Sequence, residues 1–194
     1  GTYIMPNRNG ANNLIRFTID VTDTDAYIRK KRREGMPQLT IAQIYLAAYC
    51  RVLAKYPGGN RFLSGQRIFS RGEDIVFNMI VKKEMTVEGE ETSIKVHLSP
   101  WDTLETVSRK LDEAVCRARA DDDSSFDQTT NLLKYLPGLL LKFAIWFLKV
   151  LDYFGLMPGW LLEISPFHGT VFFTSMASLG IPAIYHHLYD FGNL

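Results

Sequence analysis

The stretch that says most about the fold is residues 165–181, which read SPFHGTVFFTSMASLGI. Its β-branched and aromatic run, residues 171–174, predicts a strand. A turn of small residues follows at 175–180. Such a turn brings backbone N–H groups, or the hydroxyl of Thr174, close to a ligand. We therefore expect a candidate site at the end of this strand.

Three earlier segments alternate between apolar and polar residues and predict further strands. They are residues 14–21, 74–82 and 92–98. The last two are expected to pair as a long hairpin, with Gly89 in the connection.

Two helices are expected to cover these strands. One opens at a capping box formed by Thr40 and Gln43. Its expected apolar face comprises Ile41, Ile44, Tyr45, Ala48 and Val52. The other is expected to begin at Pro100, with Ser99 as its cap. Its expected apolar stripe comprises Leu104, Val107, Leu111, Val115 and Ala118.

A basic run, residues 29–33, ends another expected helix, which opens near Thr22 and stops before Gly35. Five consecutive cations can bind phosphates. At helical spacing, however, they point to several faces, and no aromatic side chains are interleaved with them. Cations at a helix C-terminus also complement the helix dipole. We therefore expect a solvated helix end here instead of a nucleic-acid site.

Composition and cysteine spacing argue against several classes of protein. The 194 residues carry a formal net charge of +1, which gives no global field for nucleic acid. Cys50 and Cys116 show no C-x-x-C spacing, so neither a disulfide framework nor a zinc site is indicated. Residues 1–16 lack the basic start and apolar run of a signal peptide. A cytoplasmic protein is expected, with one domain over residues 1–194.

The chain becomes strongly apolar after the acidic break at residues 121–125. The charged side chains beyond residue 123 are Asp127, Lys134, Lys142, Lys149, Asp152, Glu163 and Asp190. This C-terminal third therefore has the composition of a region that another surface covers.

Leu132 to Leu162 is the most apolar stretch, but charged residues, among them Lys142, Lys149 and Asp152, interrupt it. It therefore has no uncharged run of about 18 residues, as a membrane span requires. Pro137 and Pro158 bracket a helical segment and predict two helices instead of one. Three roles remain open: a helix packed on the sheet or in a subunit interface, an interfacial membrane anchor, or the wall of an acyl-chain pocket.

Two adjacent histidines, His186 and His187, lie near the end of the chain between Tyr185 and Asp190. These residue types can support general acid–base chemistry, although a structural role is the alternative for either histidine taken alone. A metal site is disfavoured because adjacent residues on a strand point to opposite faces.

Residues 165–181 are similar to the "GTFTISNLGMFGI" type of segment in the catalytic domain of the acyltransferase component of 2-oxoacid dehydrogenase complexes. That domain shares the fold of chloramphenicol acetyltransferase. The expected order of strands and helices agrees along nearly the whole chain. The ending, residues 185–193, resembles a stand-alone bacterial branch of the family.

The resemblance implies an α/β (α+β) fold, a mixed sheet sandwiched by helices, assembled as a homotrimer. It implies a coenzyme A-dependent acyltransferase with no metal, in which coenzyme A and the acyl acceptor enter a channel between subunits. A histidine of the family deprotonates the attacking thiol or hydroxyl, and a serine or threonine hydroxyl stabilises the oxyanion. Thr174 matches that hydroxyl position.

The chain also departs from the family pattern. The family's catalytic H-x-x-x-D-G motif lies further toward its C-terminus, and His186-His187 does not match it in spacing. The expected domain, residues 1–194, therefore lacks its C-terminal portion, and residues 124–164 form an apolar helical insert foreign to the complex-forming enzymes. No lipoyl domain is expected before it.

Two functions follow from these observations. The first is an acyltransferase that moves an acyl group between coenzyme A and a thiol or hydroxyl acceptor, which the apolar insert would allow to be lipidic. Its candidate catalytic residues are Thr174, His186 and His187. The second is a non-catalytic trimeric scaffold or binding protein with the same fold.

Overall fold

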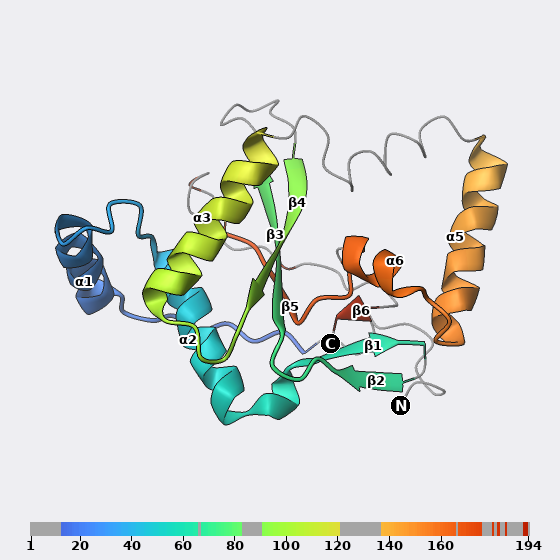
Figure 1. Cartoon of the computed structure of the whole chain (residues 1–194), viewed down its shortest axis with the longest axis horizontal. Helices are drawn as coiled ribbons and strands as arrows, with labels where there is room; N and C mark the ends of the chain where they lie inside the picture. Colours follow the sequence, from blue (N-terminus) through green and yellow to red (C-terminus); the bar gives the residue numbers. More distant parts are fainter. Residues whose placement is uncertain are drawn as a thin grey trace.

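The computed structural model describes residues 13–65, 67–82, 91–120, 137–165 and 167–175, together with residues 180, 182, 185, 192 and 193. Its helices and two small sheets form an α/β structure, in agreement with the expected general class (Figure 1).

The larger sheet has the strand order β4-β3-β5. β3 (Ile75–Lys82) and β4 (Glu91–Leu98) are antiparallel, with Ile75 opposite Leu98. β5 (Val171–Phe173) joins the other side of β3 in parallel, with Phe77 opposite Val171. These pairings confirm two predictions: the pairing of residues 74–82 with residues 92–98, and the strand that begins at residue 171. The sheet is mixed, because it contains one antiparallel and one parallel pair.

The core lies between this sheet and two helices, α2 (Ile41–Lys55) and α3 (Leu104–Ala120) (Figure 1). The central strand β3 is buried over five consecutive residues, from Ile75 to Met79. The buried core cluster comprises Leu46, Cys50, Leu53, Ile75, Phe77, Met79, Ile94, Val96, Leu98, Val107, Leu111, Ala114 and Ala118. Burial raises the pKa of the Cys50 thiol to about 11, so this cysteine is an unreactive core residue.

A second sheet, with the order β2-β1-β6, was not expected from the sequence. β1 (Arg61–Ser64) and β2 (Arg67–Ser70) form an antiparallel hairpin, and β6 (Gly192–Asn193) pairs with β1. The first two strands have only four residues each, and β2 is exposed throughout, so neither shows a usable alternation.

The prediction of a strand at residues 14–21 is wrong. Residues 13–21 form no regular element, and Ile15, Phe17 and Ile19 are all exposed. A strand requires a neighbouring strand for its backbone hydrogen bonds, and alternation alone does not provide one. The segment therefore presents an extended row of apolar side chains to its surroundings.

Helix α1 (Thr22–Arg33) follows this segment and confirms the predicted helix with a basic last turn. Its start differs in detail, because the carboxylate of Asp20 accepts hydrogen bonds from the N–H and the hydroxyl of Thr22. Gly35 follows the helix at a φ of 113°, which favours glycine.

The predicted capping box of α2 is confirmed, and its Gln43 side-chain oxygen accepts the Thr40 N–H at 2.5 Å. The predicted apolar face is wrong. The buried residues of α2 are Gln43, Leu46, Cys50 and Leu53, whereas Tyr45 and Val52 are exposed. Apolar residues surround most of this helix, so periodicity alone does not determine which face meets the sheet.

Helix α3 begins at Leu104 and not at Pro100, which corrects the expected start. Residues 99–102 form a turn in which the Ser99 N–H donates to Asp102 Oδ2 at 2.8 Å. Thr103 then accepts the N–H of Thr106 at 3.3 Å. Of the predicted apolar stripe, Val107, Leu111 and Ala118 are buried.

The apolar stretch forms two helices, as the bracketing prolines predicted. They are α5 (Gly138–Tyr153) and α6 (Gly159–Ile164). Figure 1 shows α5 at one end of the molecule, at the side opposite α1. Among the described residues, no helix has the length and apolar character that crossing a membrane requires.

Candidate functional site

Thr174 lies one residue beyond the end of β5. Its side-chain oxygen is buried and has no hydrogen-bond partner among the residues that the structure describes. A buried hydroxyl normally has a partner, because an unsatisfied one costs about 1–3 kcal/mol. Thr174 Oγ1 therefore retains the capacity to donate one hydrogen bond to a group that approaches this end of β5.

Aromatic side chains of α2 pack against Phe173, the residue before Thr174. The Tyr45 ring stacks on the Phe173 ring with a centroid separation of 5.0 Å, and the Tyr49 ring lies 6.3 Å from that of Tyr45. Tyr45 is about half exposed, whereas burial raises the pKa of Tyr49. The end of β5 is therefore held against α2 by an aromatic stack that reaches the surface at Tyr45.

The other two predicted site residues cannot be compared with Thr174. His186 and His187 both lie outside the described residues. Their proposed role in acid–base chemistry stays a prediction.

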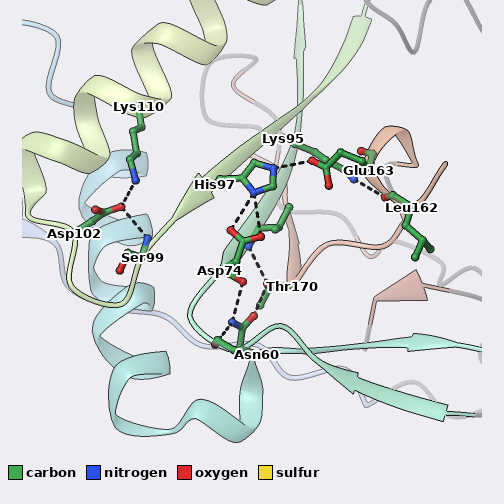
Figure 2. A network of polar contacts seen from close by, with 12 residues as sticks. Asn60, Asp74, Lys95, His97, Ser99, Asp102, Lys110, Leu162, Glu163 and Thr170 are labelled. Carbon is green, nitrogen blue, oxygen red and sulfur yellow. Dashed lines mark hydrogen bonds and ion pairs between the residues drawn. The ribbon is translucent and has the colours of Figure 1, made fainter. Parts of the chain in front are cut away.

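A buried hydrogen-bond network fixes the opposite end of β5 (Figure 2). The Thr170 hydroxyl donates to Asn60 Oδ1 at 2.6 Å and accepts the Val76 N–H at 3.0 Å. Asn60 Nδ2 in turn donates to the carbonyls of Gly72 and Asp74, each at 3.0 Å. This network joins the segments before β1, β3 and β5. It therefore determines where β5 starts and, through the length of β5, where Thr174 lies.

A surface cluster of charged residues adjoins this hydrogen-bond network (Figure 2). His97, near the end of β4, lies between two carboxylates: Nδ1 is 3.0 Å from Asp74 and Nε2 is 3.0 Å from Glu163. When protonated, the ring donates to both carboxylates and ties β4 to α6. Since both ring nitrogens are engaged and β3 lies between the strand of His97 and β5, His97 does not serve as a base for the Thr174 hydroxyl.

Arg71 and Lys95 bring positive charge to the same cluster. The Arg71 guanidinium lies over the Phe62 ring, 4.5 Å from its centroid, and burial lowers its pKa. The Lys95 ammonium donates to the carbonyls of Leu162 and Glu163 at the C-terminal end of α6. Lys95 therefore ties β4 to the end of α6, whereas Arg71 packs against β1.

Burial lowers the pKa of Lys95 to about 8, against an ordinary value of 10.5. The unfolded chain binds the proton more tightly than the folded protein, so between these two pH values unfolding takes up protons. Stability contributed at this position therefore rises as the pH increases from about 8. We expect the urea midpoint of the wild type, relative to that of Lys95→Met, to increase from pH 8 to pH 10. A pH-independent difference would contradict this interpretation.

A third polar network, fully inside the molecule, was not predicted. Asp152 Oδ1 accepts the Ser64 hydroxyl at 3.0 Å, and Asp152 Oδ2 accepts the Gly65 N–H at 3.2 Å. The ring of His168 lies between Asp152, 3.4 Å from Nε2, and Ser165, 2.8 Å from Nδ1. The network connects the end of α5 to the β1–β2 hairpin and to the segment before β5.

The order serine, histidine, aspartate in this network resembles the arrangement of a nucleophilic triad, but its geometry is that of a structural network. His168 has no exposed surface. Ser165 Oγ also accepts the N–H of Phe167 at 3.3 Å, which closes a local turn. A nucleophile requires access to the substrate, and here the base is sealed from solvent.

Metal chemistry has no counterpart in the described part of the chain. Within these residues, no group of three or more His, Cys, Asp or Glu side chains could hold a metal ion. Among these arrangements, Thr174 supplies the buried hydroxyl that has no hydrogen-bond partner among the described residues.

A scan against models of known protein families, a search of curated proteins and a search of solved structures each found no match.

Proposed function

We propose that this protein is a coenzyme A-dependent acyltransferase with a chloramphenicol acetyltransferase-like fold, in which Thr174 donates a hydrogen bond to the oxyanion of the tetrahedral intermediate. The observation that carries the proposal is the buried Thr174 hydroxyl just beyond β5, which has no hydrogen-bond partner among the described residues. It supports the proposal because an oxyanion donor must be fixed in place and unengaged before the substrate arrives.

The sequence around Thr174 supports the same function. Residues 165–181 resemble the acyltransferase segment of 2-oxoacid dehydrogenase complexes, and Thr174 occupies the hydroxyl position of that segment. The mixed sheet, in which β5 runs parallel to β3, is compatible with the fold that the resemblance implies.

The proposed reaction is a transfer between a thioester and an acceptor. A base removes the proton of the acceptor thiol or hydroxyl, whose sulfur or oxygen then attacks the thioester carbonyl carbon. The carbonyl oxygen becomes negatively charged, and the Thr174 hydroxyl donates to it. Collapse of the intermediate breaks the bond to the coenzyme A sulfur, which leaves as the thiolate and takes up the proton. His186 and His187 are the candidate bases.

A homotrimer belongs to the same proposal, because the resemblance implies a site between subunits. Two exposed apolar surfaces support an assembly of copies of this chain. One is the extended row Ile15, Phe17 and Ile19, and the other includes Tyr45 and Val52 on α2. Light scattering at tens of micromolar is expected to give the mass of a trimer, and a monomer would remove the basis for a site between subunits.

The test of function is turnover of acyl-CoA. We propose to incubate the intact protein with acetyl-CoA or octanoyl-CoA, using dihydrolipoamide as a thiol acceptor and 1-octanol as a hydroxyl acceptor, and to measure free coenzyme A by chromatography. Thr174→Ala is expected to lower kcat by about 10²-fold with little change in KM, because the hydroxyl acts mainly on the transition state. Thr174→Ser is expected to restore most of the activity.

Thr18→Ala is the control, since Thr18 is an exposed threonine in the segment before α1. It should leave kcat unchanged. If Thr174→Ala instead destabilises the protein by about 1 kcal/mol and keeps wild-type turnover, the threonine only packs. If the wild type turns over no donor, the alternative of a non-catalytic trimeric scaffold replaces the enzyme.

A further inference from the structure

Helix α5 presents an unusually large apolar surface. The exposed large apolar side chains on it are Leu139, Leu140, Phe143, Ile145, Trp146, Phe147, Leu148 and Tyr153. Phe143 and Trp146 are each more than half exposed, and their rings lie against one another with a centroid separation of 5.7 Å. Contiguous apolar surface of this kind marks an interaction site in a folded protein.

The other side of α5 is less exposed: Leu141 and Ala144 are half-buried, and Asp152 is buried. Because successive residues of a helix are about 100° apart, Phe143 and Trp146 lie on the side opposite Leu141 and Asp152, and Phe147 lies beside Phe143. The apolar surface is therefore directed away from the protein core.

The exposed charges of α5 are all positive. Lys142 and Lys149 are exposed, whereas the carboxylate of Asp152 points inward to Ser64 and Gly65. The two lysines are seven residues apart, so they lie about 20° from one another around the helix, along one border of the apolar surface. An apolar face bordered by lysines has the charge pattern that binds an anionic surface.

Aromatic side chains extend the surface beyond the helix. Phe154 and Leu156 in the following turn, and Trp160 at the start of α6, are each about two-thirds exposed. Tryptophan favours the boundary between hydrocarbon and water, where its ring is buried and its N–H remains hydrated.

We propose that α5 is a membrane-surface helix that lies in the plane of a bilayer rich in anionic phospholipid, with Phe143, Trp146 and Phe147 in the hydrocarbon boundary and Lys142 and Lys149 among the headgroups. A bilayer fits this surface better than a second copy of the chain. Lysine is depleted from the cores of protein–protein interfaces. Moreover, α5 has no exposed carboxylate that a second copy could offer to these lysines. The inference goes beyond acyl transfer and does not depend on it.

The experiment is flotation of the intact protein with two kinds of vesicle, one of phosphatidylcholine alone and one with 30 mol% phosphatidylglycerol, about a third of the lipid. Binding is expected to be stronger to the anionic vesicles and to weaken as salt increases. Lys142→Glu/Lys149→Glu should reduce partitioning at least about 10-fold, because each cation near such a surface contributes to binding. Phe143→Ser/Trp146→Ser should remove it.

The matched control is Arg29→Glu/Arg33→Glu, which makes the same change in net charge on two exposed residues of α1. It is expected to retain binding. Trp101→Phe leaves only Trp146 and Trp160 as tryptophans, and brominated lipid should quench their fluorescence in this variant. Circular dichroism checks that each variant is folded.

Three results would overturn the proposal. They are the absence of binding to anionic vesicles at low salt, an equal loss of binding in the α1 control, and unquenched tryptophan fluorescence in the Trp101→Phe variant. A change of solution mass on Phe143→Ser/Trp146→Ser, without vesicle binding by the wild type, would assign the surface to a second copy of the chain.

Discussion

Replacing Phe77 with alanine is expected to lower the free energy of unfolding by about 3–5 kcal/mol. Phe77 is fully buried at the centre of the sheet, opposite Val96 on β4 and Val171 on β5. Its ring also forms a T-shaped contact with the Tyr49 ring, with a centroid separation of 5.3 Å. The substitution leaves a cavity between β4, β5 and α2. Because these elements cannot easily move together to fill the cavity, most of the loss in stability should remain. Urea denaturation followed by circular dichroism measures it.

Ile80→Ala is the control on the same strand, because Ile80 is about half exposed. It also truncates an apolar side chain to alanine, without opening a closed cavity. We expect a loss below about 1 kcal/mol. Equal effects of the two substitutions would show that Phe77 is not at the centre of a packed core.

Asp152→Ala is expected to cost about 3–5 kcal/mol, because it leaves buried donors from Ser64 and Gly65 without their acceptor. Glu113→Ala is the matched control. Glu113 forms an exposed pair with Arg109 at 2.8 Å, one turn apart on α3, and its loss should cost about 0.5 kcal/mol or less. The measurement is again the free energy of unfolding in urea.

The same carboxylate gives a pH signature. Burial would raise the pKa of Asp152, but hydrogen bonds from His168, Gly65 and Ser64 outweigh burial and hold it below the ordinary 3.8. The carboxylate therefore contributes stability that is fully present above pH 3.8 and is lost as the pH falls through the lower native pKa. The advantage of the wild type over Asp152→Asn should shrink in that acidic range, and an advantage independent of pH would contradict the assigned hydrogen bonds.

The sequence predicted best where a local pattern and its partner were both strong. Alternation identified β3 and β4, which bury Ile75 and Phe77 against Ile94 and Val96. The same alternation at residues 14–21 led to a wrong prediction, because those residues have no neighbouring strand in the structure. Alternation reports which side chains share a face, and it carries no information about what pairs with the backbone.

The polar clusters could not be predicted because their members are distant in sequence. His97 meets Asp74 and Glu163, which lie 23 and 66 residues away. Asp152 meets Ser64 across 88 residues. Adjacent histidines such as His186-His187 are visible in a sequence, whereas isolated His97 and His168 acquire their partners only through folding. The prediction of Thr174 rests on a local signal, a strand followed by a small-residue turn.

The parallel addition of β5 has a consequence for the order of folding. β3 and β4 are joined by a short connection and can pair early, but Thr170 must close a loop of 94 residues to reach Val76. The entropy cost of that closure grows with loop length, and non-local contacts repay it only once they form. During synthesis, the apolar surface of α5 therefore emerges before β5 has docked. The nascent chain passes through a stage with a half-built sheet and an uncovered apolar helix, at which aggregation competes with folding.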